Sequence, residues 1–322
     1  MLHRWRMLAL LAVVVLASAA TVASADPGHG KAGAQSTAAE RLFTLEPDPA
    51  GNPEGVAFDN QSKAFFVSIT ADGAIYRGTL DSDTVAPFIP GAPGKAAVGV
   101  KVKDGKLYVA GGPTGTITVY DLATGQAVAG FETGADGFLN DLVVTEEGDV
   151  FVTDSFRPVL WHVTAEQVQA GSGMPQALDV SEIPFESNQF NLNGIVSEGG
   201  GRLVVVDSNS GKLFRIDLGD DQSSIRAIDE IQGATVPGGD GMLLDRGRLV
   251  VVQGNPAQLS FLKLRGGALS ATPEPEGTQT RDKLRGPSTV ARARDLYLVV
   301  NADFATSQRP FTVAGLPRMQ GG

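Results

Sequence analysis

Four residues with oxygen-bearing side chains stand at the start of short apolar segments that recur along the chain. They are Glu54 in PEGVAF, Asn140 in LNDLVV, Asn193 in LNGIV and Asp240 in GGDGMLLD. Together they offer two carboxylates and two carboxamides, an all-oxygen set with two negative charges. Because calcium takes six to eight oxygen ligands at about 2.3 to 2.6 Å, these residue types favour a hard divalent cation, Ca²⁺ above all.

The sequence has few residues that could support other metal sites or a thiol nucleophile. The sequence has no cysteine, which excludes thiolate catalysis, disulfides and a lipid anchor on Cys. A zinc site would call for His or Cys ligands. Of the three histidines, His3 and His29 precede the expected folded region, and His162 lies on a later strand of its repeat, far from the four oxygen donors.

The elements that position these residues form a repeat. Each unit has an apolar strand, a Gly-containing turn, a second apolar strand, another turn and a third strand. The units start about 40 to 55 residues apart, which is the spacing of propeller blades with four short strands each. We therefore predict an all-β, six-bladed β-propeller with four antiparallel strands per blade. A large β-sandwich is the competing architecture, but sandwiches do not repeat their sequence.

In a propeller the first strand of every blade runs along the central axis in the same direction, so equivalent first positions form a ring. Taken singly, an Asn, Asp or Gly before a strand is more often a turn former than a ligand. Four oxygen donors in phase are different, because burying their charges without a cation would be costly. The predicted ring consists of Glu54, Gly99, Asn140, Asn193, Asp240 and Pro287.

Other acidic residues have structural interpretations. Asp154 and Asp207, each followed by Ser at the end of a second strand, are predicted to make turn and blade-to-blade hydrogen bonds. Asp72, Asp104 and Asp245 look like members of ordinary hairpin turns.

The two ends of the repeat must meet for the ring to close. The last unit is short and is followed by a strand-like segment at residues 310–316, while residues 41–45 form an apolar strand ahead of the first unit. We predict that residues 41–45 supply the outer strand of the last blade, within a single domain over residues 41–318. Residues 164–170 are the one segment that favours a helical turn.

The N-terminal region predicts export. Residues 1–25 combine basic residues, an apolar run and an Ala-Ser-Ala ending, the layout of a cleavable signal peptide of a secreted protein. A signal anchor is the alternative, but the run is shorter than the roughly 20 residues that span a bilayer. Residues 26–40, rich in Gly, Ala, Ser and Pro, predict a flexible linker.

The charge balance bears on partners. The chain has 36 Asp and Glu against 26 Lys and Arg, and this acidity disfavours a nucleic-acid partner. We expect a small-molecule substrate, no membrane contact after signal cleavage, and a monomer.

The four motifs, in this order and at blade spacing, resemble the regucalcin/gluconolactonase family of six-bladed propellers and, more distantly, diisopropylfluorophosphatase and the paraoxonases. The likeness runs from about Glu54 to Asn301. It implies a channel metal held by Glu54, Asn140, Asn193 and Asp240. It also implies that Asp240 is the catalytic carboxylate in hydrolysis of lactones or related esters.

Two departures from the family concern the substrate. Sugar-lactone members place an Arg two residues before the Asn of the Asn-Asp motif, where this chain has Phe138, and the turn SFRPV in that blade is short. Phe138 and Phe190 would give an apolar mouth if they face the channel, which favours a less polar substrate. Plain packing under a loop is the alternative.

The mechanism that these residues favour is metal-assisted hydrolysis. A dication beside Asp240 should hold its pKa below the usual value of about 3.9, which makes it a weak base and leaves nucleophilic attack open. The alternative function is a non-enzymatic extracellular propeller that binds a ligand or protein and keeps its channel metal for structure alone.

Overall fold

The structure is a computed structural model that describes residues 39–319, without the side chains of residues 275–280. The described residues form 24 strands and one short helix. The predicted signal peptide and nearly all of the predicted linker, up to residue 38, lie outside the described residues.

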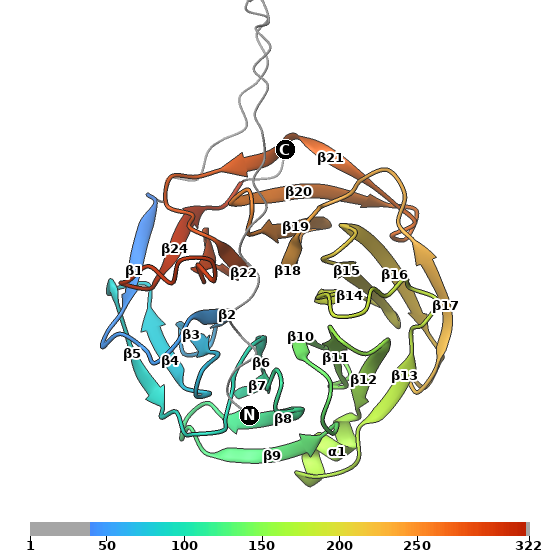
Figure 1. Cartoon of the computed structure of the whole chain (residues 1–322), viewed down its shortest axis with the longest axis horizontal. Coiled ribbons are helices and arrows are strands. Elements are labelled where there is room, and N and C mark those ends of the chain that lie inside the picture. Colours follow the sequence, from blue (N-terminus) through green and yellow to red (C-terminus); the bar gives the residue numbers. More distant parts are fainter. Residues whose placement is uncertain (1–38, 320–322) are drawn as a thin grey trace, which may run out of the picture. The chain divides into compact units, whose positions relative to one another are not determined.

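Six blades of four antiparallel strands surround a common axis, which confirms the predicted all-β propeller (Figure 1). The innermost strands are β2 (Pro53–Asp59), β6 (Val100–Lys103), β10 (Leu139–Val144), β14 (Leu192–Gly199), β18 (Gly239–Asp245) and β22 (Pro287–Ala293). The second strands are β3 (Ala64–Ile69), β7 (Lys106–Ala110), β11 (Val150–Asp154), β15 (Arg202–Asp207), β19 (Arg248–Gln253) and β23 (Leu296–Asn301).

The third strands are β4 (Ile75–Thr79), β8 (Thr116–Asp121), β12 (Val159–Val163), β16 (Lys212–Leu218), β20 (Gln258–Arg265) and β24 (Thr312–Pro317). The outer strands are β5 (Thr84–Ile89), β9 (Ala127–Glu132), β13 (Gln176–Asp179), β17 (Ile225–Glu230), β21 (Ser270–Thr280) and β1 (Arg41–Leu45).

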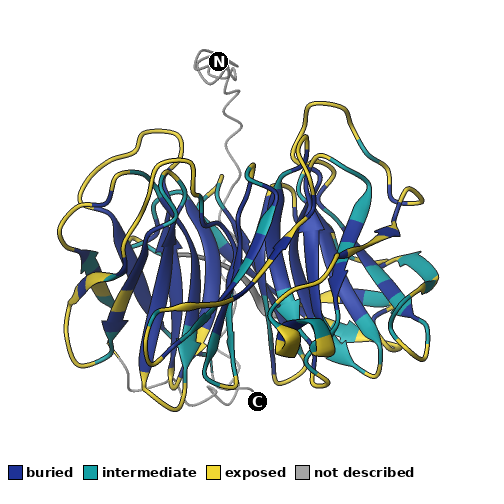
Figure 2. Ribbon diagram, turned by 90° about the horizontal axis from the view of Figure 1, so that it is seen from below, coloured by how far each residue is buried: buried dark blue, intermediate teal, exposed yellow. Residues whose placement is uncertain are grey.

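Burial explains why the strands differ in composition along each unit. The second strands are covered on both faces by neighbouring blades, so β3 and β23 are buried at every position. The outer strand β9 alternates between buried and exposed residues, as expected for a strand with one covered face. Buried residues fill the strands, while exposed residues gather in the connections at both ends (Figure 2).

The core is divided among the blade interfaces. Six clusters of buried apolar side chains are present in the described residues, and each joins side chains of two adjacent blades. Each blade is therefore stabilised by its two neighbours, as expected of a repeat unit that cannot bury both faces alone.

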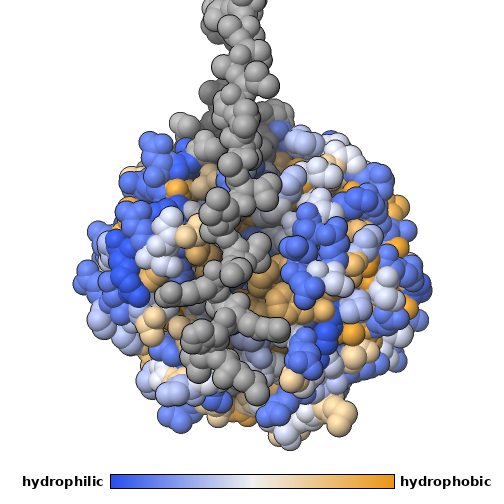
Figure 3. All heavy atoms as spheres, in the orientation of Figure 1, coloured by the Kyte–Doolittle hydropathy of each residue, from blue (hydrophilic) through white to orange (hydrophobic). Residues whose placement is uncertain are grey.

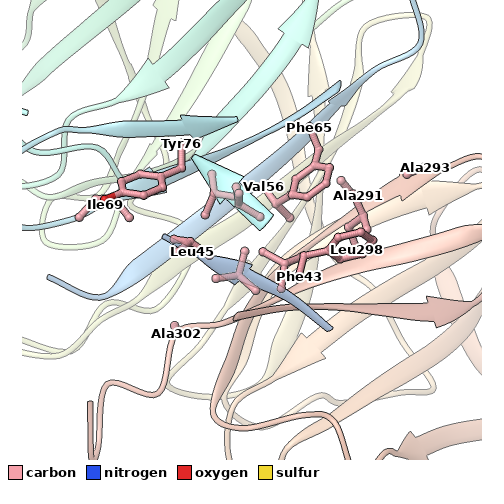
Figure 4. Close-up of a cluster of buried hydrophobic side chains, with 14 of the residues drawn as sticks. Phe43, Leu45, Val56, Phe65, Ile69, Tyr76, Ala291, Ala293, Leu298 and Ala302 are labelled. Atoms are coloured by element: carbon pink, nitrogen blue, oxygen red, sulfur yellow. The ribbon is translucent and has the colours of Figure 1, made fainter. Parts of the chain in front are cut away.

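Strand β1 closes the ring as predicted. It pairs antiparallel with β24, from Arg41 opposite Gly315 to Thr44 opposite Thr312, and so forms the outer strand of the sixth blade. It also runs parallel to β5 of the first blade. Phe43 and Leu45 of β1 are fully buried in the cluster that holds Val56, Phe65 and Leu298 of both blades (Figure 4).

A single short helix, α1 (Ala165–Ala170), interrupts the described strands and confirms the predicted helical turn. Thr164 caps its N-terminus through a reciprocal capping box with Gln167, and Gly171 ends it at a φ of 78°. No helix among the described residues has the length and apolar character to cross a membrane.

Candidate metal centre at the hub

The strand register identifies the equivalent positions at the hub. In five blades the pairing of the inner strand shifts by one residue near its start, as between Pro53 and Val56 of β2. The residue two places before the first regular pair is then the ring position. These residues are Glu54, Val98, Asn140, Asn193, Asp240 and Ser288.

The four predicted ligands thus occupy one register position on β2, β10, β14 and β18. The other two members of the predicted ring, Gly99 and Pro287, were each placed one residue off. Val98 and Ser288 are not acidic and gave no signal of their own. The neighbouring turn-forming residues, Gly99 and Pro287, were therefore taken as the ring positions.

Glu54 is held from the sixth blade. The Ser288 hydroxyl donates to the Glu54 carbonyl at 2.6 Å, and the Thr289 hydroxyl lies 3.4 Å from Glu54 Oε1. The residue is 5% exposed, and its Oε2 is buried with no hydrogen-bond partner in the described structure. A buried carboxylate oxygen without a partner is strongly unfavourable.

Within the described part of the chain, Asn193 and Asp240 each have a buried side-chain oxygen without a hydrogen-bond partner as well. Asn193 Oδ1 and Asp240 Oδ1 are both buried and have no hydrogen-bond partner among the described residues. Asn193 is itself fixed from the third blade, because the Thr153 hydroxyl donates to its carbonyl at 2.7 Å.

Asn140 is oriented by its amide nitrogen. Its Nδ2 donates to Ser155 Oγ at 2.9 Å, and Ser155 in turn donates to the Leu192 carbonyl at 2.6 Å. The amide nitrogen of Asn140 is therefore used by a hydrogen bond within the protein, and its Oδ1 remains as the atom that can bind a cation.

A hard cation fits this donor set. Leaving one buried polar group unpaired costs about 1–3 kcal/mol, and more when it is charged, so three such oxygens at one register position call for a shared partner. No cluster of three or more His, Cys, Asp and Glu suited to a metal occurs in the described residues. A cation at the hub would therefore depend on the Asn oxygens as well, which suits calcium and not zinc.

Without a cation, the pKa values of two hub carboxyl groups, Glu54 and Asp240, are raised. Burial, followed by the charges of Asp240 and Asp141, raises the pKa of Glu54 well above its usual value, against an opposing effect of Lys101. Burial and the charge of Asp141 raise the pKa of Asp240 to about 8, although the Asn193 side chain and the Gly241 N–H act to lower it. The lowered pKa predicted beside a bound dication stays a prediction.

Two further residues at the hub, Lys101 and Asp141, are not among the predicted site residues. Lys101 Nζ lies 2.6 Å from Asp141 Oδ1, and Asp141 is 3% exposed. The sequence did contain a signal, because Asn140 is followed by Asp where Glu54, Asn193 and Asp240 are followed by Gly.

Phe138 and Phe190 belong to an aromatic cluster that also contains Phe156. Their ring centroids lie 5.1 Å (Phe138–Phe190), 5.6 Å (Phe138–Phe156) and 4.9 Å (Phe156–Phe190) apart. A Cβ atom added at Gly112 would meet both Val98 Cγ2, at 2.8 Å, and the Phe138 ring, at 3.5 Å. The aromatic cluster therefore adjoins the ring of hub positions.

Asp154 and Asp207, at the ends of their second strands, accept hydrogen bonds within the turns that follow, as predicted. Asp154 Oδ1 accepts from the backbone N–H groups of Phe138 and Phe156, both at 3.0 Å, so it fixes two members of the aromatic cluster. Asp207 accepts from the backbone N–H groups of Asn209 and Ser210.

Asp245 stands at the β18–β19 hairpin turn, as predicted, but its side chain does more than form that turn. Its side chain is 2% exposed and accepts hydrogen bonds from Arg318, Tyr297 and Arg292 of the sixth blade and the strand end beyond it. Asp245 therefore joins the fifth blade to the sixth.

A hollow of about 480 Å³ elsewhere, between β8, β9 and Gly171, contains none of the predicted site residues.

Comparisons with known proteins bear on the fold. No protein-family model matches the chain, and no curated protein matches it. Among solved structures, a luciferin-regenerating enzyme aligns with a TM-score of 0.59 and 14% identity, over 86% of this chain and 95% of that one. A gluconolactonase from Xanthomonas campestris aligns with a TM-score of 0.58 and 17% identity, over 89% and 95% of the two chains.

The allergen Mala s 1 of Malassezia sympodialis is similar as well, with a TM-score of 0.63 and 13% identity, over 82% of this chain and 92% of the allergen. At such identities the likeness shows the six-bladed propeller fold and not an activity. Function must therefore be argued from the site.

Proposed function

We propose that the protein is a metal-dependent hydrolase of lactones or related esters, with Ca²⁺ as its metal. The observation that carries the proposal is the set of three buried, unpartnered oxygens of Glu54, Asn193 and Asp240 at one register position of three inner strands. The similarity to a gluconolactonase supports the same choice through the fold alone.

The chain's residues have distinct roles in this proposal. Glu54, Asn140, Asn193 and Asp240 hold the ion, and the hydroxyl donors of neighbouring blades keep Glu54 and Asn193 in place. A bound calcium ion would supply positive charge that stabilises the oxyanion formed from a substrate carbonyl. Asp240 is the candidate catalytic residue, either orienting the attacking water or attacking the carbonyl carbon itself.

The aromatic cluster favours a less polar substrate. The Arg of sugar-lactone enzymes is replaced by Phe138, and Phe156 and Phe190 remain 44% and 47% exposed beside it. An apolar surface next to a polar metal centre suits an alkyl or aryl ester, or a lactone with an apolar substituent.

The metal is tested first. The purified protein should contain about one calcium per chain by elemental analysis, and it should bind calcium again by calorimetry after treatment with a chelator. A panel of lactones, aryl esters and phosphotriesters, assayed with and without chelator, should show hydrolysis that calcium restores.

Asp240→Asn tests the catalytic role. It should weaken calcium binding by about tenfold or more, because it removes one charged ligand, and should lower kcat/KM by about 10²-fold or more. Asp179→Asn makes the same change at the exposed end of the outer strand β13 and should leave both values within about twofold. Full turnover in Asp240→Asn would reject the assignment.

The alternative, a binding propeller with a structural metal, draws its support from Phe138 in place of the Arg. It predicts that chelation lowers the melting temperature while no member of the panel is hydrolysed in any metal state. That pair of results would replace the hydrolase proposal.

A further inference from the structure

The residue after the ring position is normally a glycine, and the structure shows why. A Cβ atom added at Gly55, Gly99 or Gly194 would lie only 2.3–2.5 Å from a backbone carbonyl of the next blade. A Cβ atom added at Gly241 would lie 2.8 Å from Thr289 Cα. Asp141 departs from this pattern, because it places a buried carboxylate where four of the six blades have no side chain.

Lys101 departs from the repeat in a matching way. It stands three residues beyond the ring position, where the other five inner strands have apolar residues. These equivalent residues are Ala57, Val143, Val196, Leu243 and Ala291. The two exceptions come from adjacent blades, and they contact each other at 2.6 Å. Because the two exceptional residues carry opposite charges and contact each other, we interpret Lys101 and Asp141 as one functional pair.

The pair acts on the hub through its charge. Asp141 directly follows the ring residue Asn140, and its Oδ1 contacts Lys101 Nζ at 2.6 Å. Its Oδ2 accepts from the Ile195 N–H, two residues beyond Asn193, at 3.4 Å, so the charges of the pair lie beside two of the proposed ligands. With Glu54, Asp141 and Asp240 ionised, the carboxylates carry three negative charges, and Lys101 reduces this to two. Two negative charges match a divalent cation.

We propose that Lys101, held by Asp141, is a fixed internal cation that keeps the hub at a net charge of −2 and so selects divalent over trivalent ions. The inference rests on the metal site of the proposed function. Its physical basis is that the number of charged groups at an oxygen site tunes both affinity and the preferred ion charge. Lys101 is a tuning residue in this view, because it contacts Asp141 and not the ion.

The test compares Ca²⁺ and Tb³⁺ binding by calorimetry at one pH and ionic strength. In Lys101→Met the hub charge becomes −3, so the ratio of Tb³⁺ to Ca²⁺ affinity should rise by about tenfold or more over the wild type. In Asp141→Asn it becomes −1, and Ca²⁺ binding should weaken by about tenfold. The double variant Lys101→Met/Asp141→Asn returns to −2 and should regain the wild-type ratio.

Lys103→Met is the matched control, because Lys103 lies on the same strand but donates to the Glu146 carbonyl outside the hub. It should change neither affinity by more than about twofold. If Lys101→Met does not fold, as judged by circular dichroism, the comparison of Asp141→Asn with the double variant still isolates the lysine charge.

The outcomes separate the two proposals. A wild-type protein that binds Ca²⁺, with ion preferences unchanged in the Lys101 variants, would overturn the inference and leave the metal site standing. A wild-type protein that binds neither ion would overturn the metal site itself, and the inference with it.

Discussion

The residues of the aromatic cluster combine mutual contact with unusual exposure. Seven large apolar side chains are exposed in the described residues, and two of them, Phe156 and Phe190, belong to the aromatic cluster. The face seen in Figure 3 is mostly hydrophilic around its edge, with apolar residues in smaller areas. Apolar side chains left half exposed beside a polar site suggest contact with a ligand.

Phe190→Ser tests this role. If an apolar substrate packs on the cluster, kcat/KM for an aryl ester should fall by about tenfold, because one aromatic contact is lost. The free energy of unfolding should change by less than about 1 kcal/mol, because the residue is half exposed.

Phe304→Ser is the control for that measurement. Phe304 is 56% exposed and makes no ring contact with the aromatic cluster within the described structure. Equal losses of kcat/KM in the two variants would show that the cluster has no specific role.

The sequence predicted single residues well where the repeat is regular. Glu54, Asn140, Asn193 and Asp240 were aligned correctly because each precedes an apolar strand by the same spacing. Lys101 was missed, because its partner lies on another blade and no spacing rule connects them.

Among the elements, one carboxylate adds a buried polar contact to the apolar interface between the fifth and sixth blades. Asp245 ends β18, and its partners Tyr297 and Arg318 lie on β23 and just beyond β24. Its neighbours Arg246 and Gly247 have the positive φ angles of a tight turn, which is why the local sequence indicated a turn alone. Its distant partners are invisible to any local pattern.

Asp245→Asn should lower the free energy of unfolding by about 3–5 kcal/mol at pH 7, since it leaves Arg318 buried without its counter-charge. Denaturation by urea measures this. Asp104→Asn is the control, because that turn aspartate is exposed, with a φ of 49° that Asn tolerates. It should cost less than about 0.5 kcal/mol.

The effect of Asp245→Asn should depend on pH. Burial acts to raise the pKa of Asp245, but the hydrogen bonds from Arg318 and Tyr297 and the Arg318 charge prevail and lower it. A lowered folded-state pKa adds stability that is complete above the unfolded value of about 3.9 and is lost as the pH falls through the folded value. The difference between wild type and Asp245→Asn should therefore shrink below about pH 4 and stay constant between about pH 6 and 8.

At the scale of the whole described unit, ring closure depends on β1. The repeat predicted this correctly, because a sixth unit with only three strands must borrow its fourth. The sequence could not show the parallel contact of β1 with β5, since that pairing involves only Thr44 with Thr84 and Leu45 with Val85.

A chain that begins at residue 48 should be less stable than one that begins at residue 39 by at least about 5 kcal/mol. It loses two fully buried side chains, Phe43 and Leu45, and the pairing with β24. Thermal and urea unfolding of the two chains measure the difference. Equal stability would contradict closure by β1.

The pairing of β1 with β24 has a consequence for biosynthesis. The ribosome makes β1 first among the strands of this unit and β24 last, so the sixth blade cannot be completed until nearly the whole chain has been synthesised. Contacts between residues so far apart in sequence form slowly. Earlier blades can assemble on their neighbours while synthesis continues, but the burial of Phe43 and Leu45 is not complete until the final strand arrives.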